Sequence, residues 1–231
     1  MHVSIERPLL ADRSGATLIE FALTLPIILA LGLYGLEMCN FALASLQVSQ
    51  IALNLADNAS RVGSMQSDNS TQLREIDIND VLTATRLQGE KIALTGRGRI
   101  VLSSLEESGG KQYIHWQRCL GLAKGAAFDS HYGTAPIDAA TQSGPSYGGT
   151  EVNGMGDAGS IVIAPPGTGV MFVEVNYQYK PVLNGFWIMS QASQHLRYTA
   201  SFIVRDRRSY GQIYNPTPTS QRYTCDKYSD A

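Results

Sequence analysis

A long apolar run near the start of the chain dominates its hydrophobic pattern. Residues 16–38 are almost entirely apolar, and Glu20 and Glu37 are the only acidic residues among them. As a helix, the 23 residues would span roughly 35 Å, which is enough to cross a bilayer. Pro26 is tolerated in membrane helices. A buried core helix is the alternative, but the pattern favours a transmembrane helix over 16–38.

The residues that follow this run keep a helical period. Apolar side chains recur at spacings of three and four, which predicts one apolar stripe on an amphipathic helix over 39–63. The stripe consists of Phe41, Ala44, Val48, Ile51, Leu55, Ala59 and Val62. A secretory signal peptide has a shorter apolar stretch that ends at a small-residue cleavage site, so the pattern argues against one. We therefore expect one helix of some 45 residues that begins in the membrane and emerges from it.

Beyond the long helix, residues 64–208 show the patterns of a small α+β domain. Asn79 or Asp80 is expected to cap a short helix that runs to about Leu87 and ends at Gly89, because short oxygen-bearing side chains accept the free N–H groups of the first turn.

Alternating segments predict the strands of this domain. Residues 99–106 and 112–118 flank Gly109 and Gly110 and predict a β-hairpin, since glycine supplies the positive φ of such turns. Further strands are expected over 160–164, 170–179 and 195–205. The long helix packed on a small antiparallel sheet would bury the apolar faces of both, which gives the α+β fold class.

Two segments lack periodicity. Residues 121–160 hold nine of the 22 glycines and predict a long loop, which is either a tolerated surface insertion or a partner-binding loop. Residues 209–231 are rich in Tyr, Pro, Ser and Thr and by themselves predict a loose tail.

Cysteine chemistry offers a tether for that tail. If the domain lies outside the cytoplasm, Cys119 and Cys225 are expected to form a disulfide. On the entropic model the bridge would restrict the unfolded chain by about 4–5 kcal/mol. The competing hypothesis is a metal site made of His115, Cys119, His131 and Cys225, but no pair of them has ligand spacing.

The third cysteine belongs to a row of small side chains at the membrane exit. Gly32, Gly35, Cys39 and Ala42 lie on one helical stripe, where small side chains permit close approach of another helix. We expect packing, and no chemistry, at Cys39.

Charge and composition exclude several classes of protein. The chain has 18 Lys and Arg, 20 Asp and Glu, a net charge of −2 and 44% hydrophobic residues. It is therefore neither a strongly basic nucleic-acid binder nor an acidic tail, and it can bury a sizeable core. Arg7 and Arg13 precede the apolar run and no Lys or Arg follows before Arg61, so the N-terminus is predicted to be cytoplasmic.

Glu20 is an unusual residue at the start of an apolar span. A carboxylate there is costly and marks a partner or a function. A cut of the backbone between Gly15 and Ala16 would place an α-ammonium at Ala16, one helical turn from Glu20. That cation could pair with Glu20 of the same chain or of a neighbour, and set the register of assembly.

The segment around this position resembles a type IV prepilin processing site. It is Arg13-Ser-Gly-Ala-Thr-Leu-Ile-Glu-Phe21. In that superfamily an aspartic membrane peptidase cuts after glycine, and the fifth residue of the mature chain is glutamate. A cut after Gly15 would give Glu20 that place.

Within the superfamily the chain resembles the TadE-like proteins, which are pseudopilins or minor pilins of the tight-adherence (Tad, or Flp) pilus. The resemblance covers about 13–63, including Ala56-Asp-Asn-Ala-Ser-Arg61. Beyond it only Val173-Glu-Val-Asn-Tyr-Gln-Tyr-Lys-Pro181 is similar to the family's usual strand. The length argues against the short major pilins. The related TadG-like proteins share the N-terminal pattern but often carry a much larger domain.

The resemblance implies a location and partners. Residues 1–15 would be a cytoplasmic leader, and the chain would cross the bacterial inner membrane once, with its C-terminal domain in the periplasm. It would either stay in that membrane or be incorporated into the pilus. The partners would be the prepilin peptidase, other pilins or pseudopilins, the inner-membrane assembly platform and the lipid bilayer. No nucleic-acid partner and no cofactor are expected.

Three common motifs of catalysis are missing from the sequence. There is no P-loop, no H-E-x-x-H and no C-x-x-C, and the 4 histidines lie in unrelated segments. We therefore expect a structural protein and no enzyme. The alternative function is an uncleaved, membrane-anchored binding module, such as a sensor or an adhesin.

Overall fold

The computed structural model describes residues 14–138, 148–182 and 194–230. The chain divides into two compact units. The first comprises residues 1–43 with 181–186, and the second comprises 44–180 with 187–231. Helix α1 (Ser14–Arg61) is a single element of 48 residues, so the predicted long helix is confirmed.

The first unit contains the apolar part of α1. This part of the helix is strongly apolar, and its most apolar stretch is not buried. Among the described residues, α1 is the one helix that is long and apolar enough to cross a membrane. Most of the predicted leader, residues 1–13, lies outside the described residues.

The second unit is an α+β domain. Its elements after α1 are, in chain order, β1 (Ser64–Met65), β2 (Thr71–Gln72), α2 (Glu75–Gln88), the 3-10 turn η2 (Glu90–Ile92), α3 (Leu94–Arg97), β3 (Gly98–Ser108), β4 (Lys111–Leu120), β5 (Thr150–Val152), β6 (Gly169–Gln178) and β7 (His195–Ile203).

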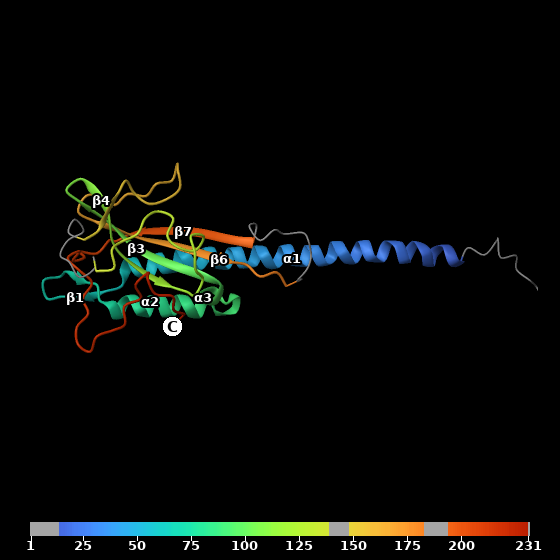
Figure 1. Ribbon diagram of the computed structural model, residues 1–231, viewed down its shortest axis with the longest axis horizontal. Helices are drawn as coiled ribbons and strands as arrows, with labels where there is room; N and C mark the ends of the chain where they lie inside the picture. Colours follow the sequence, from blue (N-terminus) through green and yellow to red (C-terminus); the bar gives the residue numbers. More distant parts are fainter. Residues whose placement is uncertain (1–13, 139–147, 183–193, 231) are drawn as a thin grey trace, which may run out of the picture. The chain divides into compact units, whose positions relative to one another are not determined.

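An antiparallel sheet of five strands forms the centre of this unit, in the order β5-β4-β3-β6-β7 (Figure 1). Strands β3 and β4 are the predicted hairpin, and Ser108 pairs with Lys111 at its turn. Gly109 and Gly110 occupy the turn with φ of 61° and 79°, a region that glycine reaches at little cost. The expected strands over 170–179 and 195–205 are present as β6 and β7.

One face of the sheet is covered by helices. The C-terminal part of α1 and helix α2 lie along it (Figure 1), and Gln47 of α1 donates to the carbonyl oxygen of Gln88 of α2 at 3.0 Å. The predicted stripe supplies the contact, because its five members from Ala44 to Ala59 are at most 5% exposed. Phe41 and Val62, at the two ends of the stripe, are half-buried.

The described part of the glycine-rich segment 121–160 lies on the other face of the sheet. The backbone N–H of Ala135 donates to the Gln117 side chain of β4 at 3.0 Å, and the Ser130 hydroxyl donates to Glu174 of β6. An apolar cluster fills part of this side; it consists of Leu105, Ile114, Met155, Ala164, Val170 and Phe172. The segment contains β5 and is therefore more structured than the predicted loop.

Two predicted elements are wrong in detail. Helix α2 begins at Glu75, four residues before Asn79, the first expected cap. The cause is Asp77 in the first turn, which caps the N-terminus by accepting the backbone N–H of Arg74 at 3.0 Å. Residues 160–164 form no strand; their single pairing is an isolated bridge between Met155 and Val162.

Candidate functional site

The expected cleavage point lies in the first turn of α1. The helix is described from Ser14, so Gly15 and Ala16 lie in its first described turn. A Cβ atom built on Gly15 would meet no atom within 4 Å.

Glu20 lies one turn further along the same helix and is exposed. Ala16 and Glu20 are four residues apart, a spacing that brings side chains or terminal groups on a helix together. The carbonyl oxygen of Glu20 accepts the Thr24 hydroxyl at 2.9 Å, a bond that leaves the Glu20 carboxylate available. Its pairing with an Ala16 ammonium stays a prediction.

The row of small side chains is uncovered in this single chain. Cβ atoms built on Gly32 and Gly35 would meet nothing within 4 Å, and Ala42 is exposed. Cys39 is exposed and has a free thiol. The helix approach predicted for this row therefore needs a second molecule and stays a prediction.

Glu37, near the far end of the apolar run, is buried. It is 7% exposed, although the hydropathy pattern places it where water or lipid headgroups could solvate it. Its carboxylate accepts the backbone N–H of Val182 at 3.1 Å, in the same compact unit. The connection between β6 and β7 thus returns to α1 at this residue, a contact that no local sequence pattern indicates.

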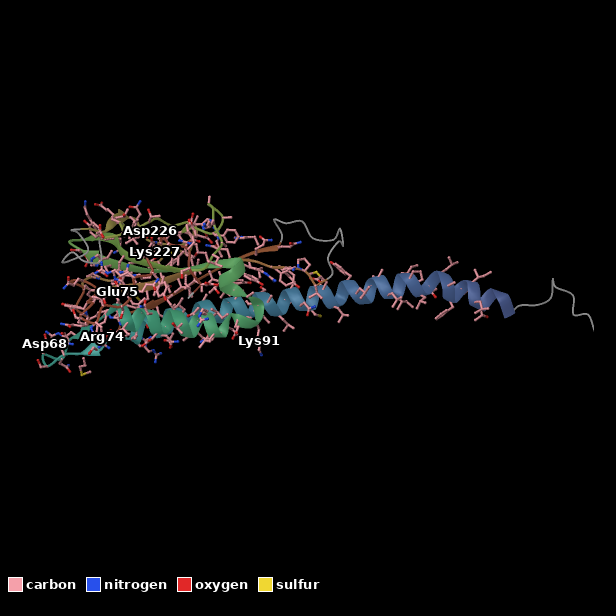
Figure 2. All side chains as sticks on the ribbon, turned by 60° about the horizontal axis from the view of Figure 1, so that its bottom comes forward. Asp68, Arg74, Glu75, Lys91, Asp226 and Lys227 are labelled. Atoms are coloured by element: carbon pink, nitrogen blue, oxygen red, sulfur yellow. A yellow bond between two sulfur atoms is a disulfide. The ribbon has the colours of Figure 1, made fainter. Side chains whose placement is uncertain are left out.

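The C-terminal segment is fixed to the sheet. Cys119 of β4 and Cys225 form a disulfide between residues 106 positions apart, with a Cα–Cα distance of 4.8 Å. The backbone N–H of Cys119 also donates to the carbonyl oxygen of Tyr223 at 2.7 Å. Figure 2 shows Asp226 and Lys227 of this segment beside the sheet. The expected disulfide is therefore confirmed, and it tethers the described residues 209–230, which by themselves would be a loose tail.

Arg99 of β3 is a second anchor for the same segment. It is 1% exposed, donates to the carbonyl oxygen of Cys225 and stacks its guanidinium 4.0 Å from the centroid of the Tyr228 ring. Asp129 lies 3.4 Å from its Nε. Burial lowers the pKa of Arg99, although Tyr228 and Asp129 oppose that shift.

Arg208 closes the C-terminal end of α1. Its guanidinium donates to the carbonyl oxygens of Ala59, Ser60 and Val62 at 3.2, 3.1 and 2.8 Å. These carbonyls lie at the end of a helix, where partners within the helix run out and a cation is favoured. Burial lowers the pKa of Arg208.

A buried ion pair joins α2 to the sheet. Arg118 of β4 donates through Nε to Glu75 at 2.9 Å and through Nη2 to the other carboxylate oxygen, and both side chains are at most 2% exposed. Figure 2 shows Glu75 next to Arg74 at the start of α2. Sequence analysis missed the roles of Arg99 and Arg118, because an arginine within a strand carries no periodic signal. Arg208 belongs to the basic run 205–208, which is typical of a solvated strand end, yet Arg208 is buried.

The competing metal site is excluded by its own residues. Cys119 and Cys225 are joined to each other. His115 lies 2.9 Å from Glu106 on the helix-covered face of the sheet, whereas the backbone N–H of His131 donates to Glu174 on the opposite face. Within the described ranges no three His, Cys, Asp or Glu residues are arranged to hold a metal ion.

The architecture is pilin-like: an N-terminal hydrophobic helix lies on an antiparallel sheet, and a disulfide fixes the C-terminal segment. Comparisons of the chain with protein-family models, curated proteins and solved structures found no match. The family resemblance therefore depends on the sequence motifs alone.

Proposed function

We propose that the chain is a TadE-like pseudopilin or minor pilin that is processed by a prepilin peptidase and takes part in biogenesis of the Tad pilus. Its role is structural, with no catalytic step of its own. It resides in the bacterial inner membrane with its folded domain in the periplasm, and its partners are other pilins or pseudopilins and the assembly platform.

One observation carries the proposal. The Gly15–Ala16 bond stands at the beginning of the long apolar helix, with the exposed carboxylate of Glu20 one turn beyond it. An anchor that is never cut has no need of glycine at this point or of a carboxylate at the start of its span. The pilin-like architecture supports the same function.

The test is the N-terminus of the mature protein. The full chain is expressed with and without the prepilin peptidase of its own pilus system, extracted from membranes and analysed by intact mass and N-terminal sequencing. We expect Ala16 as the first residue when the peptidase is present, and Met1 when it is absent. Met1 in both samples would make the processed-pilin function wrong and favour the uncleaved binding module.

Two variants sharpen this test. Gly15→Leu should block the cut, because the peptidase of this family accepts a small residue before the scissile bond. Gly35→Leu is the matched control, since Gly35 lies on the same helix and its Cβ position is also open. Gly35→Leu should be cut like the wild type.

A further inference from the structure

Helix α1 has a second apolar stripe that the sheet does not cover. In contrast to the buried stripe, Leu43, Leu46 and Leu53 remain 64%, 59% and 47% exposed. Gln50, also exposed, stands between the last two. The spacings are three, four and three, which is the a and d pattern of a coiled coil.

The same pattern continues toward the N-terminus of α1. With Leu43 and Gln50 at position a, the preceding a positions are Leu36 and Leu29, and Cys39 and Gly32 fall at d. We call these eight residues from Leu29 to Leu53 the leucine seam. It spans more than three heptads, a length over which such a pattern is typical of helix pairing.

The part of the seam beyond the apolar span carries the argument. Within the span nearly every residue is apolar, so leucine at a and d is not distinctive there. Beyond it, from Ala44 to Arg61, Leu46 and Leu53 are the only large apolar side chains that remain exposed. Leaving them in water forgoes the free energy of burial, which a second helix at a and d recovers.

We propose that the leucine seam binds the leucine seam of a second copy of this chain, as a parallel and in-register helix pair. Gln50 favours a second copy of this chain over a different helix as the partner. A buried amide at position a needs a polar partner at the same level, and an identical helix in register supplies Gln50 of the second copy.

Charge also favours a second copy. Between Leu29 and Ala56 the only charged residue is Glu37, which falls at position b of the same heptads, away from the seam. Two identical helices therefore meet without like charges at a, d, e or g. The parallel orientation follows because the apolar parts of both helices would enter the same membrane from the same side.

Cys39 allows a direct test. It lies at d, so two copies in register bring their Cys39 residues to one level, within the Cα separation of about 4–7 Å that a disulfide needs. The chain has 3 cysteines, and the other two are joined to each other. Mild oxidation of the full chain in membranes should therefore give a covalent dimer that dissociates on reduction.

Shifted cysteines test the register. In a Cys39→Ser background, Leu46→Cys and Leu53→Cys should each give the dimer. Asn58→Cys is the matched control, because Asn58 is exposed on the same helix but falls at position b; it should give about tenfold less product or none. Equal cross-linking at Asn58 would indicate random collision and overturn the proposal.

Disruption of the seam is the complementary experiment. Leu46→Asp with Leu53→Asp should lower the dimer formed through Cys39 by about tenfold or more, since both changes place charges at d. Asn58→Asp should leave it unchanged. Retention of the disulfide between Cys119 and Cys225 shows that each variant has folded, and an undiminished dimer in a folded Leu46→Asp, Leu53→Asp variant overturns the proposal.

The identity of the partner is read from size. Two versions of the chain with tags of different mass are expressed in the same membranes, and a mixed dimer is expected beside the two pure dimers. A cross-linked product that contains another protein, or no product from any seam position, overturns the second-copy proposal. The outcome does not depend on a cut at Gly15, so it is separable from failure of the proposed function.

Discussion

Nη1 of Arg208 donates a hydrogen bond to the carbonyl oxygen of Ala59 at 3.2 Å, although the two residues are 149 positions apart. The guanidinium also reaches Ser60 and Val62. The end of the helix that emerges from the apolar span is thus closed by a residue from the segment after β7. This contact couples the start of the domain to its last third.

Replacement of Arg208 by Gln should destabilise the domain by about 2–3 kcal/mol, because several carbonyl groups at a buried helix end lose a charged donor. Arg207→Gln is the matched control, since Arg207 is the exposed neighbour, and it should change the free energy of unfolding little. Chemical denaturation of the detergent-solubilised chain measures both. Equal effects of the two variants would contradict the capping role.

Removal of the disulfide should release the C-terminal segment. The double variant Cys119→Ser, Cys225→Ser is expected to lose about 4–5 kcal/mol on the chain-entropy model, for a loop of 106 residues. Hydrogen exchange should rise in residues 209–230. Cys39→Ser is the control and should affect neither quantity, because its thiol is free. Unchanged exchange in the double variant would show that Arg99 and the backbone hydrogen bonds suffice as anchors.

Glu20→Leu should leave membrane insertion intact and impair assembly of the pilus. The change removes a charge that is costly in the span and preserves helix propensity, so a defect would arise from lost pairing with the Ala16 ammonium. Glu37→Gln is the comparison and should matter less, because an amide oxygen can still accept the N–H of Val182. Piliation is scored at equal membrane abundance; normal piliation by Glu20→Leu in cells without another copy contradicts the register role.

Glu174 should make the stability of the domain depend on pH. Burial raises its pKa above the ordinary 4.5, against the opposing hydrogen bonds from His131 and Ser130. The folded state then holds the proton more tightly than the unfolded state, so the free energy of unfolding should fall as the pH rises from 4.5 through the raised pKa.

Glu174→Gln should remove this contribution, because glutamine does not titrate and its amide oxygen can still accept one of the two hydrogen bonds. Urea denaturation at a series of pH values measures the effect. The matched control is Glu107→Gln near the end of β3, where hydrogen bonds from Gly167 and Gly110 lower the pKa of the carboxyl, so this change should alter the pH dependence in the opposite sense. An identical pH profile for wild type and Glu174→Gln would contradict the prediction.

Much of the fold could be predicted because its signals are local. A few neighbouring residues suffice to predict several elements. Examples are the apolar run, the stripe from Ala44 to Ala59 and the two glycines of the β3–β4 turn. The start of α2 could not be placed from the sequence. The expected caps were Asn79 and Asp80, but the helix begins earlier, where Asp77 accepts the backbone N–H of Arg74. Asn79 instead donates to the carbonyl oxygen of Gln221 at 2.8 Å.

The sequence by itself determined the long apolar helix, its buried stripe, the hairpin and the candidate processing motif, since each depends on the order and spacing of neighbouring residues. Only the tertiary structure decided that Arg99 anchors residues 209–230 beside the disulfide, that Arg208 closes α1 and that Leu46 and Leu53 stay exposed. Those outcomes depend on which distant segments reach the same place. The burial of a residue and its hydrogen-bond partner depend on how these distant segments pack against each other, and periodicity along the chain does not predict that packing.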